Sequence, residues 1–408
     1  MLHILGQPRA LAHLQRAVHS GRLASTWIFA GPTGVGKFNA ALAMAKTCLC
    51  DHPISTSNCQ AGVFRVPALP DDFILTLPCN TCESCIAIEH SNHPDLHVVS
   101  RQLIRYHDKS GKSKGTTLSI DVIRGEITGN ASEEHRVEAK LYKRSQRNRG
   151  KWFIIDEADL MEFPAQNSLL KALEEPPPAS YLIMITASPG ELLSTIRSRS
   201  QIVRFSALPE AVVVTVLKQR GATSDQAGLL ARLSGGSLGR ALAWFDQEES
   251  VAPARPTKVG TATKTKTAKP SADVFTWVQQ ITAGLDHLAN GRCVSMELAA
   301  TIQSQAEEYA QRSLKQDPLA SKDRAIRDGV AVMLGFIAAW FDDRLRNRVG
   351  AAVSIPLPSD VHAMPESVIT ECLRIGRKAE AQLDANAHVG LLLATTTTAW
   401  EQAMAACG

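Results

Sequence analysis

Residues 31–38 read Gly-Pro-Thr-Gly-Val-Gly-Lys-Phe, between a short apolar run at 27–30 and a helix-forming run at 39–46. A strand, a glycine loop and a helix in this order form a phosphate cradle when the loop follows the pattern G-x-x-x-x-G-K. Backbone N–H groups of such a loop converge on an anion, and the helix N-terminus adds positive potential. We therefore expect a nucleotide-binding loop that uses Gly31, Gly34, Gly36 and Lys37.

One chemical part of this loop is missing. The residue after the lysine is normally Ser or Thr, whose hydroxyl holds Mg²⁺, but this chain has Phe38 there. A phenyl ring offers no oxygen to a metal. The sequence therefore leaves open whether the loop binds ATP with Mg²⁺.

A second motif occurs about 120 residues later, where residues 151–159 read Lys-Trp-Phe-Ile-Ile-Asp-Glu-Ala-Asp. An apolar strand ending in Asp-Glu is typical of a Walker B element. In such an element Asp156 reaches the Mg²⁺ and Glu157 orients the attacking water. A strand that merely ends in a helix cap is the simpler alternative, but the pairing with the glycine loop favours the nucleotide site.

Composition sets the broad class of the protein. The chain has 408 residues, a length that suggests two or three domains. Of these residues 44% are hydrophobic and 21% are charged, and the formal net charge is +4. No signal peptide is visible at the N-terminus, and the longest apolar run, 330–341, is too short to cross a bilayer. We expect a cytoplasmic protein without membrane contact, whose nine cysteines are thiols or metal ligands.

Three of these cysteines, Cys79, Cys82 and Cys85, have C-x2-C-x2-C spacing. With one more thiolate they can hold a tetrahedral Zn²⁺, and four thiolates leave no open position, as in a structural site. Small buried residues are the alternative, which the triplet makes less attractive. The sequence predicts a zinc knuckle within residues 50–85.

Spacing alone does not identify the fourth ligand. Cys50 is the first choice because it ends the helix after the glycine loop, with Cys59 second and Cys48 third. His93 and His97 are explained as well by a turn and a strand face as by metal binding.

The rest of the chain divides by composition and periodicity. Residues 51–78 resemble a loop insertion, and the basic stretch 101–117 resembles a mobile loop. After 273 the pattern is all helical, with two apolar stripes. The predicted divisions are a parallel-sheet core at 1–206, a three-helix lid at 207–246, a disordered basic linker at 247–272 and a helical domain at 273–408.

Taken together, these features resemble the AAA+ clamp-loader subunits of bacterial DNA polymerase III. The shared features are Gly6-Gln7, the glycine loop, the cysteine knuckle, Asp156 to Asp159, the helix at 167–177, Ser198-Arg199-Ser200, Gly239-Arg240-Ala241 and the helical C-terminus. The resemblance covers essentially the whole chain, and its motifs lie within 5–245. It implies an α/β AAA+ P-loop domain, a helical lid and an all-α, collar-like oligomerisation domain.

The resemblance also implies roles and partners. Arg199 matches an arginine that acts in trans on a neighbouring subunit's ATP site, where it would stabilise charge on the γ-phosphoryl group. Arg197 is the alternative by position, and a surface salt bridge is the structural alternative for Arg199. Arg240 matches a nucleotide-contacting arginine. The implied partners are gamma/tau-type and delta-type subunits, a sliding clamp and primed DNA, within a DNA polymerase holoenzyme.

Departures from the family pattern decide among its members. Phe38 replaces the metal-binding hydroxyl, Ser200 replaces a usual Cys, and Ala187 or its neighbour Thr186 falls at a polar sensor position. The gamma/tau motor subunits keep Lys-Thr or Lys-Ser in the loop. We therefore expect a subunit with little or no ATPase activity of its own, which supplies Arg199 to a neighbour. A gamma/tau-like active ATPase is the first alternative, and a zinc-containing nucleic-acid-binding protein is the second.

Overall fold

The computed structural model describes residues 4–61, 65–107, 117–129, 139–249, 274–316, 321–348, 364–385 and 387–405. It divides into two compact units, Met1–Val212 with Ser237–Gly239, and Val213–Gly236 with Arg240–Gly408. Most of the stretch predicted as a basic loop, 108–116, and of the predicted linker, 250–272, lies outside the described residues.

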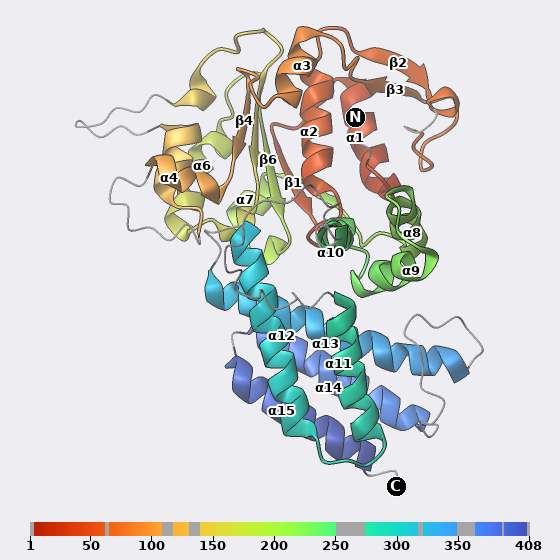
Figure 1. Ribbon diagram of the computed structural model, residues 1–408. Coiled ribbons are helices and arrows are strands. Elements are labelled where there is room, and N and C mark those ends of the chain that lie inside the picture. The colour runs from red at the N-terminus through yellow and green to blue at the C-terminus, as the bar shows by residue number, and fades with distance from the viewer. Residues whose placement is uncertain are drawn as a thin grey trace, which may run out of the picture. The chain divides into compact units, whose positions relative to one another are not determined.

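The first unit is built on a parallel sheet of five strands in the order β4-β5-β6-β1-β7 (Figure 1). The strands are β1 (Thr26–Ala30), β4 (Leu96–Val99), β5 (Lys151–Ile155), β6 (Ser180–Thr186) and β7 (Gln201–Arg204). All residues of β1 and β5 are buried, as expected of strands with helices on both faces. This confirms the α/β P-loop core predicted from the apolar runs.

Helices lie on both sides of this sheet. Figure 1 shows α1 and α2 on one side and α4 and α6 on the other. On the first side, Met44 and Leu49 of α2 share a buried cluster with Phe29 and Ile183 of the strands. The helices are α1 (Pro8–Ser20), α2 (Lys37–Leu49), α3 (Glu83–Glu89), α4 (Ile104–His107), α5 (Ile120–Ile123), α6 (Phe163–Glu174) and α7 (Ser194–Ser198).

Residues 51–78 are not simply a loop, so that prediction was wrong. They contain an antiparallel hairpin of β2 (Ile54–Ser57) and β3 (Ile74–Leu77), in which Ile54 pairs with Leu77. Leu75 is fully buried and shares a small cluster with Val66 and with Ala12 of α1. The hairpin therefore has a core of its own against the first helix.

The second unit is helical throughout its described residues. Three short helices, α8 (Glu210–Gln219), α9 (Ser224–Leu233) and α10 (Leu238–Glu249), occur where the sequence predicts a lid. They are followed by α11 (Val274–Ala289), α12 (Ser295–Gln316), α13 (Lys322–Arg348), α14 (Glu366–Asp384) and α15 (Val389–Ala405). The predicted apolar stripe of α13 is confirmed, because Val330 and Met333 are fully buried. Among the described helices, none combines the length and apolarity that a membrane span requires.

Candidate functional site

The glycine loop connects the end of β1 to the start of α2, at the carboxyl edge of the sheet. The Gly31 amide donates to the carbonyl of Thr186, the last residue of β6, at 3.2 Å. Gly31, Gly34 and Gly36 all have positive φ. A Cβ atom on Gly31 would lie 2.2 Å from the Phe205 carbonyl oxygen, so only glycine fits there.

Lys37 is buried, and its ammonium contacts the loop itself. Its Nζ donates to the carbonyl of Pro32 at 2.6 Å and to that of Gly31. Burial lowers the pKa of Lys37, while the negative charges of Asp159 and Asp156 act in the opposite direction. A phosphate bound here would have to compete with two carbonyls for this ammonium.

Phe38 lies at the first turn of α2 and packs, partly buried, against the hydrophobic cluster beneath the helix. The position that carries a hydroxyl in a complete loop is therefore used for packing.

The acidic pair follows β5 at the same edge of the sheet. Asp156 lies beside Lys37, and burial raises the pKa of its carboxyl group. Glu157 has a left-handed backbone, with φ 51°. Its Oε2 accepts a 2.7 Å bond from Nε of Arg101, a buried residue just after β4. The carboxylate expected to orient water is thus held by an arginine of the same chain.

Arg101 is a site residue that the sequence analysis missed. It was grouped with the basic stretch 101–117, of which 108–116 lie outside the described residues. A signal was present, because Arg101 follows one parallel strand by two residues and Glu157 follows the adjacent strand by two. Carboxyl ends of neighbouring parallel strands lie together at one edge.

The two candidates for the polar sensor position, Thr186 and Ala187, make different contacts. Thr186 is buried at the end of β6, and its Oγ1 accepts from the Ser188 amide at 2.9 Å. Ala187 is exposed, and its amide donates to Asp159 Oδ1 at 3.3 Å. Of the two candidates, Thr186 has the polar side chain, and its carbonyl also accepts from the Gly31 amide.

The two predicted arginines belong to different units. Arg199 ends α7 and is exposed, with its guanidinium 3.0 Å from Glu174 Oε1. Arg240 belongs to the second unit, where its charge acts on Tyr309 of α12. Its neighbour Gly239 belongs to the first unit and donates a backbone bond to Gly34 at 2.9 Å.

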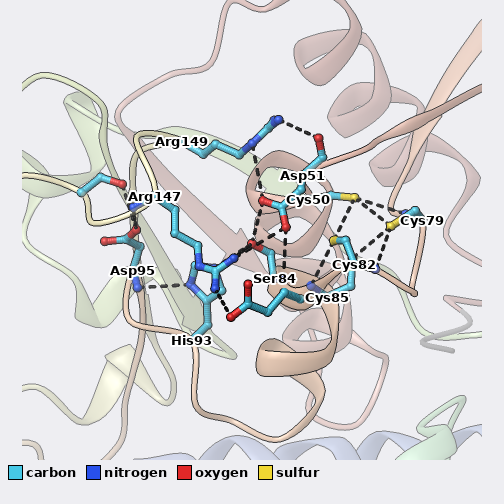
Figure 2. Close-up of polar contacts among 12 residues, drawn as sticks. Cys50, Asp51, Cys79, Cys82, Ser84, Cys85, His93, Asp95, Arg147 and Arg149 are labelled. Carbon is cyan, nitrogen blue, oxygen red and sulfur yellow. Dashed lines mark hydrogen bonds and ion pairs between the residues drawn. The ribbon is translucent and has the colours of Figure 1, made fainter.

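The four cysteines of the predicted knuckle come together in space. The ligand atoms of Cys50, Cys79, Cys82 and Cys85 all lie within 4.8 Å of one another (Figure 2). The sulfur–sulfur distance is 3.5 Å for Cys50–Cys79, 3.8 Å for Cys50–Cys82 and 4.0 Å for Cys79–Cys85, too long for a disulfide. A tetrahedron with metal–sulfur bonds of 2.3 Å has edges of about 3.8 Å, so the donor set fits a thiolate-bound metal.

The hairpin explains why Cys50 joins this group. Because β2 and β3 are antiparallel, the segment before β2, which contains Cys50, meets the segment after β3, which contains Cys79. The Cys79 amide donates to Cys50 Sγ at 3.3 Å, and the Cys82 amide donates to Cys79 Sγ at the same distance. Cys59 is exposed beside Ser57 and lies outside the group.

Backbone donors also favour the thiolate form. A hydrogen bond from the Thr81 backbone is the main cause that lowers the pKa of Cys79 to about 5. Burial instead raises the pKa of Cys50 and Cys85, so these two thiols need a cation nearby to ionise at neutral pH. His93 and His97 do not belong to the cluster of possible metal ligands.

Comparison with known proteins gives a consistent group of relatives. Residues 6–64 and 69–209 match a family described as DNA polymerase III, delta subunit. The chain is 31% identical over 228 residues to the DNA polymerase III subunit delta' of Bacillus subtilis, covering 56% of each protein. It is 34% identical over 169 residues to the Escherichia coli subunit delta', covering 41% of this chain and 44% of that protein.

The motor-type subunits are also similar. The DNA polymerase III subunit gamma/tau of Mycobacterium bovis is 28% identical over 252 residues, which is 60% of this chain and 36% of that protein. The chain thus spans about half the length of the delta' subunits it matches, and less of the gamma/tau subunit.

Proposed function

Through residues 6–64 and 69–209 the chain belongs to the DNA polymerase III delta subunit family, and from this membership we propose that it is a delta'-type clamp-loader subunit. It would work in the cytoplasm with gamma/tau-type and delta-type subunits to place a sliding clamp on primed DNA. The Bacillus subtilis and Escherichia coli relatives named subunit delta' support this choice.

The observation that carries the proposal is the state of the glycine loop. Phe38, partly buried, packs against the hydrophobic cluster at the position where a Mg²⁺-binding hydroxyl is needed. Lys37 donates to carbonyls of its own loop. Both features oppose tight binding of ATP with Mg²⁺, so we infer that the chain hydrolyses little or no ATP. The loop is retained because it joins β1 to α2.

Arg199 is the part of the chain that would take part in chemistry. Its guanidinium is exposed, and its ion pair with Glu174 is at the surface, where such a pair contributes about 0–1 kcal/mol. The arginine can therefore leave Glu174 at little cost and reach a phosphate held by a neighbouring subunit. There it would stabilise charge that develops on the transferring phosphoryl group.

The test is reconstitution of the complex with gamma/tau-type and delta-type subunits. We expect Arg199→Ala to lower DNA-stimulated ATP hydrolysis and to slow clamp loading by at least about tenfold, since a trans arginine contributes roughly 10³–10⁵ in rate at its site. Glu174→Gln removes the ion pair but keeps the arginine, and Arg197→Ala removes a nearby exposed arginine. Both controls should load clamps normally. Unchanged loading by Arg199→Ala would refute the trans role.

We also propose that the four-cysteine cluster holds a structural Zn²⁺. Four thiolates complete a tetrahedral shell and leave no position for substrate. The metal supplies folding free energy there, because the unfolded chain has no preformed site. Elemental analysis of protein purified without chelators should give about one zinc per chain. Its absence would exclude the site.

A self-sufficient ATPase is the second candidate, supported by Lys37, Asp156, Glu157 and Arg240 and by the gamma/tau relative. It predicts micromolar binding of Mg·ATP to the isolated chain and turnover that Lys37→Ala abolishes. A zinc-dependent nucleic-acid-binding protein ranks third, since it leaves the Asp-Glu motif and Arg199 without a role. It predicts tight DNA binding by the isolated chain.

A further inference from the structure

The cysteine cluster is surrounded by a polar network that reaches a distant part of the chain. We use the name polar network for six of its residues, which are Asp51, Ser84, His93, Asp95, Arg147 and Arg149 (Figure 2). Asp51 and Ser84 lie between or beside the cysteines, whereas Arg147 and Arg149 come from the segment that leads into β5. The polar network lies wholly within the first unit.

Asp51 joins the two halves of the cysteine cluster. It follows Cys50 directly, and its Oδ1 accepts from Ser84 Oγ at 3.0 Å. Its Oδ2 accepts from the Ser84 amide at 3.3 Å. Ser84 stands between Cys82 and Cys85 and is fully buried. The position of this carboxylate therefore depends on the cysteines being gathered.

Two arginines connect Asp51 to the segment before β5. Arg149 donates to the Asp51 carbonyl at 2.8 Å. The guanidinium of Arg147 lies 3.6 Å from Asp51 Oδ2 and 2.7 Å from Glu83 Oε1, and it donates to Ser84 Oγ at 3.3 Å. One side chain thus contacts residues next to three of the four cysteines.

The segment itself is anchored at its other end by Asp95. This buried carboxylate accepts from Ser145 Oγ at 2.9 Å and from the amides of Gln146 and Arg147 at 2.8 and 2.9 Å. The Asp95 carbonyl accepts from the amide of Trp152 in β5 at 2.8 Å. Residues 143–150 contain no helix or strand, so contacts such as these hold the segment that leads into β5.

His93 completes the connection between the two ends. The Asp95 amide donates to His93 Nδ1 at 3.1 Å, so the neutral ring carries its proton on Nε2, which faces Ser84 Oγ at 3.4 Å. A ring nitrogen that donates cannot accept the serine proton. Ser84 and His93 are therefore structural partners and do not form a nucleophile with its base.

We propose that metal binding at the four cysteines orders residues 145–150 through this polar network, and that Arg147 and Asp51 in turn raise the affinity for the metal. The reciprocity is required, because two events that stabilise each other do so by the same factor. Outer residues that orient metal ligands typically change affinity by roughly 10- to 100-fold. The inference rests on the proposed metal site and is independent of clamp loading.

The consequence for the molecule is a fixed start for β5. This strand runs from Lys151 to Ile155, and Asp156 and Glu157 follow it directly. The register of the strand itself is set by pairing with β4 and β6, and the ordered segment fixes how the chain enters it. The knuckle would thus be part of the support of the acidic pair.

The test uses the full chain with and without Zn²⁺, followed by hydrogen exchange. In the natural protein, amides of residues 145–152 should exchange at least about tenfold faster after chelation, while β6 changes less. In Arg147→Ala the same amides should exchange fast whether or not metal is bound. Metal-independent exchange in the natural protein would overturn the proposal.

Metal affinity gives the second arm of the test. Competition with a chromogenic chelator should show roughly 10- to 100-fold weaker Zn²⁺ binding by Arg147→Ala and by Asp51→Asn. Co²⁺ bound to either variant should keep the absorption of a tetrahedral thiolate site, which shows that the cysteines still gather. Arg144→Ala is the matched control, because Arg144 is exposed and three residues away. Arg147→Lys provides a milder change if Arg147→Ala fails to fold. Natural affinity in both Arg147 variants would overturn the proposal, and a chain that binds no metal would overturn it together with the zinc site.

Discussion

Phe38 is the residue on which the nucleotide question depends. Replacing it by Thr would restore the hydroxyl that the loop lacks, at the expense of packing in the cluster under α2. Valine has nearly the same shape as threonine but no hydroxyl, so the difference in affinity between Phe38→Val and Phe38→Thr isolates the effect of one oxygen. We expect Phe38→Thr to bind Mg·ATP more tightly than Phe38→Val by about tenfold in equilibrium titrations. Equal affinities in the presence of Mg²⁺ would show that the missing hydroxyl is not what limits binding.

His97 makes stability depend on pH. Its ring stacks on Phe153 at 4.8 Å, and its Nε2 has no partner among the described residues. Burial, then the charges of Lys140 and Lys151, lowers the pKa of His97 to about 4. Because the folded pKa lies below the ordinary value of about 6.5, the unfolded chain binds the proton more readily. The stability that the neutral His97 ring contributes is therefore complete above pH 6.5 and is lost as the pH falls toward 4.

The corresponding measurement compares the natural protein with His97→Phe, which keeps the stacking but cannot titrate. Between pH 7 and pH 4.5 the natural protein should lose about 1–2 kcal/mol more stability in urea unfolding, after allowance for partial solvent screening. His19→Phe, at an exposed position, controls for added aromatic surface. Parallel pH profiles for the natural protein and His97→Phe would contradict the assignment.

At the scale of elements, the α12–α13 contact depends on one glycine. A Cβ atom on Gly329 would lie 2.7 Å from the carbonyl oxygen of Ala306 in α12, whereas a Cβ on Gly335, farther along α13, meets nothing within 4 Å. Gly329→Ala should therefore destabilise the second unit by about 1–3 kcal/mol through overpacking. Gly335→Ala should stabilise it by about 0.5–1 kcal/mol, since alanine favours a helix. Calorimetry of the two variants checks the contrast, and effects of the same sign would refute it.

The elements differ in how well the sequence predicts them. The runs that became β1 and β5 are continuously apolar, because both faces of these strands are covered, and they were recognised. The β2 strand, Ile54 to Ser57, is mostly polar and half-exposed, so no alternation marked it as a strand. Missing this hairpin is also why spacing could not choose between Cys50 and Cys59, since the hairpin is what brings Cys50 to Cys79.

The site was predictable in the same uneven way. Loop and strand motifs indicated Lys37 and Asp156, because their chemistry depends on neighbours along the sequence. Arg101 and Glu157 are 56 residues apart, and their contact follows from the order of strands in the sheet. That order needs long-range pairing information, which residue types alone do not carry. Arg199 was selected from a family resemblance, and its role remains a prediction.

At the scale of the whole molecule, the two compact units should respond differently to metal removal. The four cysteines belong to the first unit, and no group of possible metal ligands occurs among the described residues of the second. Anything that binds only the folded state of one unit stabilises that unit alone. We therefore expect calorimetry to resolve two transitions, of which chelation lowers only one, by at least about 5 °C.

The two transitions can be assigned by hydrogen exchange during heating, since β1 and β5 report on the first unit and α12 and α13 on the second. Cys82→Ser should lower the first transition and remove its response to chelator, because one thiolate of the shell is lost. Cys59→Ser should leave both transitions and the response unchanged, since Cys59 lies outside the cluster. A single transition, or an equal shift of both transitions by chelation, would contradict this expectation.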